Sequence, residues 1–106
     1  MLDDSIIVVI RYTALPDRVT DASAALVSLI DTVVATEEEC IGITMHRTDD
    51  DPTAILLWEE WTSREAYLGE HMQTPHLRAF IDRAAELWAG PPEITFWLRT
   101  HEAMPE

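Results

Sequence analysis

The chain has 106 residues, 47% of them hydrophobic, and its 20 acidic residues outnumber seven basic ones to give a formal charge of −13. A chain of this length is expected to form a single domain over residues 1–106, and its negative charge disfavours nucleic acid and anionic membranes as partners. The sequence contains no lysine, which excludes a Schiff-base lysine and therefore pyridoxal phosphate chemistry.

The spacing of the glycines and the single cysteine exclude further kinds of functional site. Gly42, Gly69 and Gly90 are too widely separated to build a glycine-rich phosphate loop. Cys40 alone cannot form an internal disulfide or a thiolate metal cage, and a buried thiol is favoured over a nucleophile. The N-terminal stretch MLDDSIIVVI has acids where a secretory signal has basic residues, and no apolar run reaches the ~18 to 20 residues of a membrane span. We therefore expect a soluble, cytoplasmic protein.

The first half of the chain predicts a strand followed by a helix. The β-branched run Ile6–Tyr12 is typical of a buried strand, and Pro16 comes shortly after it. Apolar residues then recur every three or four positions from Val19 to Val34, which indicates an amphipathic helix. This helix is expected to end near Glu37–Glu39, whose carboxylates are most simply solvated.

A β-hairpin is expected next. Cys40–Arg47 and Ala54–Trp61 both have the composition of strands, and the acidic and proline-containing stretch between them favours a turn.

The last third of the chain predicts two helical segments and a final strand. Thr62–Glu65 has the capping-box pattern, so a helix is expected to begin directly after Trp61. Pro75 interrupts this helix and starts another, in which apolar residues from Leu77 to Trp88 share one face. Ile94–Arg99 is the last predicted strand.

This order of elements fits an α+β, ferredoxin-like βαββαβ fold with a four-stranded antiparallel sheet and helices on one face. However, the strands are apolar on both faces: Ile7 and Val9 point opposite to Ile6 and Val8, and Trp58 points opposite to its strand neighbours. Exposing roughly six such side chains would forgo on the order of 10 kcal/mol. A second copy of the sheet is the simplest cover, so we predict a homodimer.

Several segments resemble one known family. The family signature is matched by Glu59-Glu60-Trp61-Thr62-Ser63-Arg64-Glu65-Ala66, then His71, then Thr74-Pro75-His76-Leu77 and Phe80. Together with Tyr12, Pro16 and Glu39–Gly42, these residues resemble the antibiotic biosynthesis monooxygenase family over about residues 5–99.

The resemblance implies a dimeric α+β barrel and a monooxygenase without cofactor or metal, which oxidises an electron-rich phenol, quinol or aromatic polyketide with O₂. It also implies a ligand cleft between the sheet and the helices, lined by residues that include Trp61, Tyr67, His71, His76 and Phe80. Quinone-forming and haem-degrading members rely on an active-site asparagine, and this sequence has none.

Three residues are candidates for catalysis. His71 follows Tyr67 by four residues and so shares its stripe of the helix, above the strand face that carries Glu59 and Trp61. In the functional hypothesis, Glu59 orients His71, and His71 takes a proton from a phenolic substrate. In the structural alternative, His71 is a buried imidazole tied to a carboxylate such as Glu59. Trp61 is equally compatible with a core ring and with a pocket wall.

Four residues are candidates for substrate binding, namely Tyr67, His76, Phe80 and Arg83. For His76 at a helix start, solvent exposure or capping is the alternative, and for Arg83 it is a surface ion pair rather than an oxyanion anchor. The spacing of His71 and His76 matches no familiar metal motif. Two further functions remain open: a non-catalytic dimer that binds a small hydrophobic molecule, and haem binding through His71 or His76.

Overall fold

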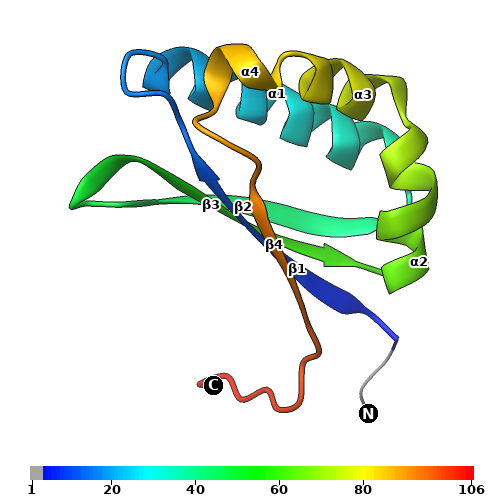
Figure 1. Ribbon diagram of the computed structural model, residues 1–106. Helices are drawn as coiled ribbons and strands as arrows, with labels where there is room; N and C mark the ends of the chain where they lie inside the picture. Colours follow the sequence, from blue (N-terminus) through cyan, green and yellow to red (C-terminus); the bar gives the residue numbers. More distant parts are fainter. Residues whose placement is uncertain (1–3) are drawn as a thin grey trace.

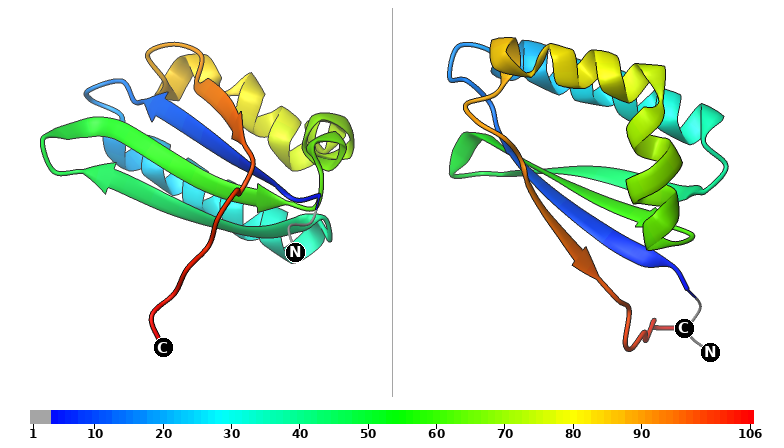
Figure 2. Two further views of the ribbon diagram at one scale, coloured as in Figure 1. Left: turned by 90° about the horizontal axis from the view of Figure 1, so that it is seen from below. Right: turned by 45° about the vertical axis from the view of Figure 1, so that its right-hand side comes forward.

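The computed structural model describes residues 4–106 and has two layers, a four-stranded antiparallel sheet and a layer of helices on one of its faces (Figures 1 and 2). The strand order in the sheet is β2-β3-β1-β4. The first residues of the N-terminal stretch considered above as a signal sequence, Met1–Asp3, lie outside the described part. The predicted α+β, ferredoxin-like fold is confirmed.

The elements follow one another as predicted, with short breaks in the second helical region. They are β1 (Ile6–Thr13), α1 (Val19–Thr36), β2 (Cys40–Thr48), β3 (Asp51–Trp61), α2 (Arg64–Ala66), the π-helix η1 (Tyr67–His71), α3 (Pro75–Asp82), α4 (Ala84–Leu87) and β4 (Glu93–Trp97).

The register of the central strand sets the two faces of the sheet. β1 pairs with β3 so that Ile6 lies opposite Trp61, and with β4 so that Ile10 lies opposite Ile94. Alternate residues of β1 and β3 pack beneath the helices and form the core with α1. They are Ile6, Val8, Ile10, Tyr12, Ile55, Leu57 and Trp61.

Helix α1 covers the sheet through Ala22, Leu26 and Val33, which are all but completely buried. By length and mean hydropathy, 1.4 over Val19–Thr36, this helix would also be apolar enough to cross a membrane, contrary to the prediction that no apolar run reaches that length. Core helices of soluble proteins meet the same criterion, and α1 packs here against the sheet and α3.

The helix after β3 begins two residues later than predicted, and its cap is different. Ser63 is the N-cap, and its hydroxyl accepts a hydrogen bond from the Ala66 amide at 3.1 Å. The predicted reciprocal capping box starting at Thr62 is wrong, because the Thr62 hydroxyl instead donates to Glu39. Pro75 begins α3 as predicted.

Several strand boundaries differ from the prediction by one residue, and two differ by more, at the start of β3 and at the end of β4. β3 begins at Asp51, so the turn of the hairpin is shorter, and Thr48 pairs directly with Asp51. β4 ends at Trp97 rather than Arg99, and the chain then leaves the sheet (Figure 1).

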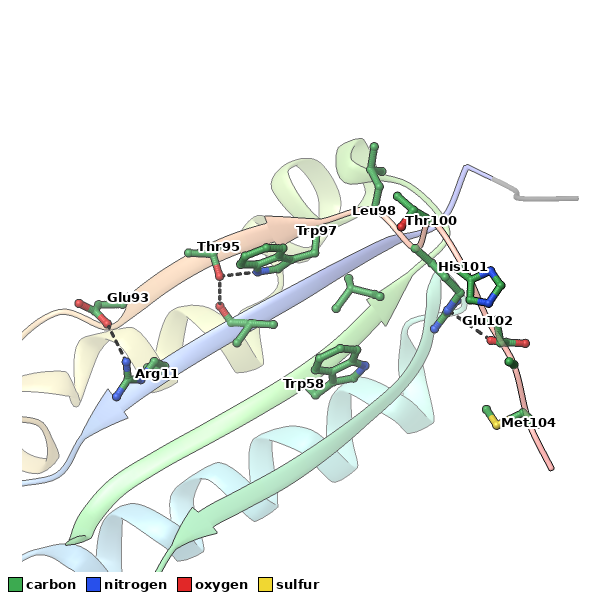
Figure 3. A pocket seen from close by; sticks show the side chains of 14 residues that line it. Arg11, Trp58, Glu93, Thr95, Trp97, Leu98, Thr100, His101, Glu102 and Met104 are labelled. Carbon is green, nitrogen blue, oxygen red and sulfur yellow. Dashed lines mark hydrogen bonds and ion pairs between the residues drawn. The ribbon is translucent and has the colours of Figure 1, made fainter. Parts of the chain in front are cut away.

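The face of the sheet without helices, hereafter the open face, is apolar as predicted. Trp58 and Trp97 are 43% and 56% exposed there, and both rings lie on the side of the sheet away from the helices (Figure 3). The C-terminal residues 98–104 run beside this face and, with Ile7 and Val9, enclose a groove of about 900 Å³. Isolated in water, such a surface is unusual for a monomer.

Candidate active site

A carboxyl group and an imidazole lie inside the apolar layer between the sheet and the helices. Glu59 on β3 and His71 on η1 are 4% and 5% exposed. Glu59 follows Leu57 and precedes Trp61 on the same face of β3, so the alternation of the strand directs its carboxyl group inward. Buried ionisable groups need partners, and the contacts of these two define the site.

The His71 ring packs against two aromatic rings, which also contact each other. Its ring centroid is 4.5 Å from that of Trp61 and 5.1 Å from that of Tyr67, while Trp61 and Tyr67 are 5.6 Å apart in an edge-on arrangement. The prediction that Tyr67 and His71 share one stripe is confirmed. The turn that carries them is a π-helix, a form that occurs frequently at functional sites.

The carboxylate that contacts His71 is Glu37, at the C-terminal end of α1. His71 Nδ1 lies 2.9 Å from Glu37 Oε1, and His76 Nε2 lies 2.6 Å from the other oxygen, Oε2. The prediction that Glu59 orients His71 is therefore wrong, and so is the reading of Glu37 as a solvated acid, because its side chain is only 11% exposed. His76 is correspondingly half-buried rather than solvated.

The Glu37 contact fixes the state of the His71 ring. An ionised carboxylate only accepts hydrogen bonds, so Nδ1 of His71 donates, and the neutral ring keeps its lone pair on Nε2. Burial lowers the pKa of His71 below its usual value of 6.5, and the hydrogen bond and charge of Glu37 oppose this effect without cancelling it. The neutral imidazole, which is the form that can accept a proton, is thus favoured at neutral pH.

Glu59 is held by Trp61 instead. The Trp61 indole Nε1–H donates to Glu59 Oε1 at 2.9 Å. Burial raises the pKa of Glu59 to about 7; the Trp61 hydrogen bond works against this shift, and the charge of Glu37 adds to it. Glu59 therefore changes its protonation state near neutral pH inside the core.

We expect the stability of the protein to fall between pH 4.5 and about 7 because of Glu59. Over this range the unfolded chain has already lost the Glu59 proton, whereas the folded chain still holds it, since the folded pKa is raised from 4.5 to about 7. The free energy of unfolding should therefore decrease by roughly 3 kcal/mol as pH rises through this window, and then level off. Denaturant unfolding at a series of pH values measures the effect.

Glu59→Gln should remove this decrease while keeping an acceptor for Trp61. Glu65→Gln, at an exposed position on α2, serves as the matched control and should retain the decrease. Parallel pH profiles for wild type and Glu59→Gln would contradict the assignment.

Other titratable groups near Glu59 are held in their neutral forms. Burial, reinforced by the charge of Glu59, raises the pKa of Tyr12 and of Tyr67. Burial and, to a smaller extent, the charge of Glu59 raise the pKa of Cys40 to about 11. Its thiol is therefore protonated at neutral pH, which is not the state of a nucleophile.

Phe80 belongs to a second aromatic group at the other end of the core. Its ring lies 6.2 Å from Tyr12 and 6.0 Å from Trp88, and Tyr12 and Trp88 are 4.6 Å apart. The structure therefore does not bring Phe80 against the rings around His71, although both groups lie under the same helix layer.

Two open cavities flank the Glu37 contacts. One of about 340 Å³ is lined by Glu37, Trp61 and Thr74 among others, and one of about 270 Å³, between α1 and α3, is lined by His76, Phe80 and Arg83 among others. Arg83 itself is exposed and forms an ion pair with Glu86 at 3.4 Å, the surface alternative considered above. The predicted lining residues are thus divided between these two cavities and the buried rings.

The structure gives no metal-binding arrangement to these residues. Within residues 4–106, no group of three or more histidine, cysteine, aspartate or glutamate side chains is placed to hold a metal ion. The histidine nitrogens that face Glu37 do so at hydrogen-bond distances.

Solved structures share this fold over almost the whole chain. Rv0793 from Mycobacterium tuberculosis is 27% identical, with a TM-score of 0.81 and coverage of 94% of this chain and 99% of that one. PA3566 from Pseudomonas aeruginosa is 20% identical, with a TM-score of 0.84 and coverage of 95% and 99%, and at this identity it shows the fold alone.

Sequence comparison points the same way. The chain is 28% identical over 95 residues to the uncharacterised protein sll1783 of Synechocystis sp.; the match covers 90% of this chain but only 63% of that relative's length. The family profile described as antibiotic biosynthesis monooxygenase matches residues 5–83, which include β1, α1, the hairpin, Glu37, His71 and His76. The chain belongs to the antibiotic biosynthesis monooxygenase family.

Proposed function

We propose that this protein is a cofactor-independent monooxygenase that oxidises an electron-rich phenol or quinol, or an aromatic polyketide, with O₂. Membership of the antibiotic biosynthesis monooxygenase family supports the reaction class. The observation that carries the proposal is His71, a neutral imidazole held through Nδ1 by Glu37 and packed against the rings of Trp61 and Tyr67.

His71 is the general base of the proposed reaction. Its Nε2 takes the hydroxyl proton of the substrate, and the resulting phenolate is electron-rich enough to reduce O₂ directly. For a hydroquinone, one oxygen atom enters the ring to give a hydroxyquinone, and the other leaves as water with two hydrogens of the substrate. All electrons come from the substrate, so the protein's share is deprotonation, orientation and exclusion of water.

Trp61 and Tyr67 orient the substrate in this scheme, because flat aromatic rings beside the base favour a planar ligand. Glu59 stays a catalytic candidate as a carboxyl group that titrates near neutral pH two residues from Trp61. His76, Phe80 and Arg83 line the neighbouring cavity and are proposed to contact the outer part of the substrate.

Oxygen consumption by metal-stripped protein tests the proposal. With a panel of hydroquinones and anthrones, we expect O₂ uptake and quinone absorbance to rise together, without added flavin or metal. Saturable substrate binding with no O₂ uptake would instead favour a binding protein that uses the same residues.

Haem binding is less compatible with the site. His76 Nε2 is already 2.6 Å from Glu37, so ligation through this atom would break that contact. A titration with haemin that produced a sharpened Soret band would restore this alternative.

We also propose that the functional unit is a homodimer in which two open faces pack together. The exposed Trp58 and Trp97 and the apolar groove beside them support this arrangement. A cytoplasmic location stays a prediction.

A further inference from the structure

Glu37 is the centre of a three-residue chain of hydrogen bonds. Its carboxylate contacts His71 Nδ1 at 2.9 and 3.1 Å, and its Oε2 contacts His76 Nε2 at 2.6 Å. The three residues come from separate elements: Glu37 from the C-terminal end of α1, His71 from η1 and His76 from the first turn of α3. One carboxylate therefore joins two imidazoles.

The chain runs from the interior toward the surface. The His71 side chain is 6% exposed, that of Glu37 is 11% exposed and that of His76 is 20% exposed. His76 also lines the cavity of about 270 Å³ between α1 and α3. A proton on His76 can consequently reach solvent, whereas a proton on His71 is enclosed.

A single negative charge in this position stabilises one imidazolium well but not two. Both rings donate to the ionised Glu37, and a second positive charge would face the first across the same carboxyl group. Protonating the more exposed ring costs less free energy, because burial penalises the charged form. When the cluster holds one positive charge, geometry therefore favours His76 over His71 as its place, because the His71 side chain is the more deeply buried.

We propose that Glu37 is a positioning residue that couples His71 to His76, so that proton uptake by the buried imidazole expels a proton from the half-exposed one. This inference rests on the proposed function, because the coupling serves to carry the substrate's proton away from the site.

The substrate O–H bond breaks, and an N–H bond forms at His71 Nε2, which makes His71 an imidazolium. In the singly charged cluster, His76 then releases its Nδ1 proton to water and keeps the Nε2–H that donates to Glu37. One proton has left the substrate, one has reached solvent, and the total charge of the three residues is unchanged.

Other ionisable groups surround the cluster. On the sheet side these are Glu59 of β3, whose pKa is raised partly by the charge of Glu37, and Cys40 of β2, whose pKa that charge also raises. Tyr67 stacks on His71 from within η1. The rim of the neighbouring cavity carries Glu38, Glu39 and Glu70. None of these bridges the two histidines, so the coupling is specific to Glu37.

Nuclear magnetic resonance titration of the full chain with ¹³C- and ¹⁵N-labelled histidine tests the coupling without any substrate. The chain has four histidines, which substitution by glutamine assigns one at a time. In His76→Gln, the titration midpoint of His71 should move to higher pH by about one unit, because the competing charge is gone.

Glu37→Gln should move the titration midpoint of His71 to lower pH, since it removes the negative charge beside that ring. Glu38→Gln, at the adjacent exposed position, is the matched control and should leave the His71 midpoint in place. A His71 midpoint that is the same in wild type and in folded His76→Gln would overturn the proposal. Because His76 is only half-buried, His76→Gln is expected to fold, and it tests the coupling even if Glu37→Gln does not fold.

The titration separates this inference from the proposed function. Coupled midpoints in a protein that consumes no O₂ would leave the coupling standing and remove its catalytic purpose. Independent midpoints in an active enzyme would remove the coupling alone.

Discussion

Replacing His71 with glutamine is expected to lower the rate of quinone formation by roughly 10²- to 10⁴-fold, the usual contribution of a general base. The glutamine amide can still donate to Glu37, but it cannot accept a proton at neutral pH. Because the pKa of His71 is lowered by burial, the wild-type rate should persist below pH 6.5 and fall only at more acidic pH, as the ring gains its proton. The measurement is quinone absorbance against pH for both proteins.

Arg78→Gln is the control for this substitution. Arg78 is exposed on α3, away from the open face, and its replacement should leave the rate unchanged. Circular dichroism should show that both variants are folded. If folded His71→Gln retains the wild-type rate, His71 is not the base, and Glu59 becomes the next candidate.

Replacing Trp58 with glutamate is expected to convert a dimer into a monomer. In a twofold-symmetric interface each copy contributes its own Trp58, so two charges would be buried together. At about 2 kcal/mol or more for each copy, the dissociation constant should rise about 10³-fold or more. Sedimentation at micromolar concentration should find wild type at twice the mass of the chain and the variant at the mass of one chain.

Val27→Glu is the control, because it places the same charge at an exposed hydrophobic residue outside the proposed interface. Val27 lies on α1, on the other side of the sheet, and its exposure, 48%, is close to the 43% of Trp58. This variant should remain dimeric. Sedimentation of wild type as a stable monomer would contradict the proposed interface, and the open face would then need another explanation.

Much of the fold could be predicted from local sequence because local patterns define its elements. The β-branched run of β1, the helical spacing of α1 and the proline that begins α3 each act within one element, and each was predicted within about two residues. The failures occurred where a local signal was ambiguous. Thr62 and Ser63 are adjacent hydroxyl residues, and only the path of the chain after β3 decides that Ser63 caps the helix while Thr62 binds Glu39.

The candidate site was predicted in part, for a related reason. Trp61, Tyr67 and His71 lie within eleven residues, and strand and helix periods were enough to place them together. Glu37 was missed because it is 34 residues from His71 and stands in a run of three glutamates that is typical of a solvated helix end. A possible signal was its position directly after the buried Val33 stripe of α1, one turn further along the helix.

The sequence by itself determined the order of the elements, the two apolar faces of the sheet and the inward direction of Glu59, Trp61 and His71. These follow from the periods of strands and helices, which depend on neighbouring residues only. The tertiary structure alone decided which carboxylate contacts His71, that His76 joins the same carboxylate, and that Glu59 titrates near neutral pH. Those properties depend on burial and on contacts between segments distant in the chain. The local sequence pattern determines neither the burial nor these contacts.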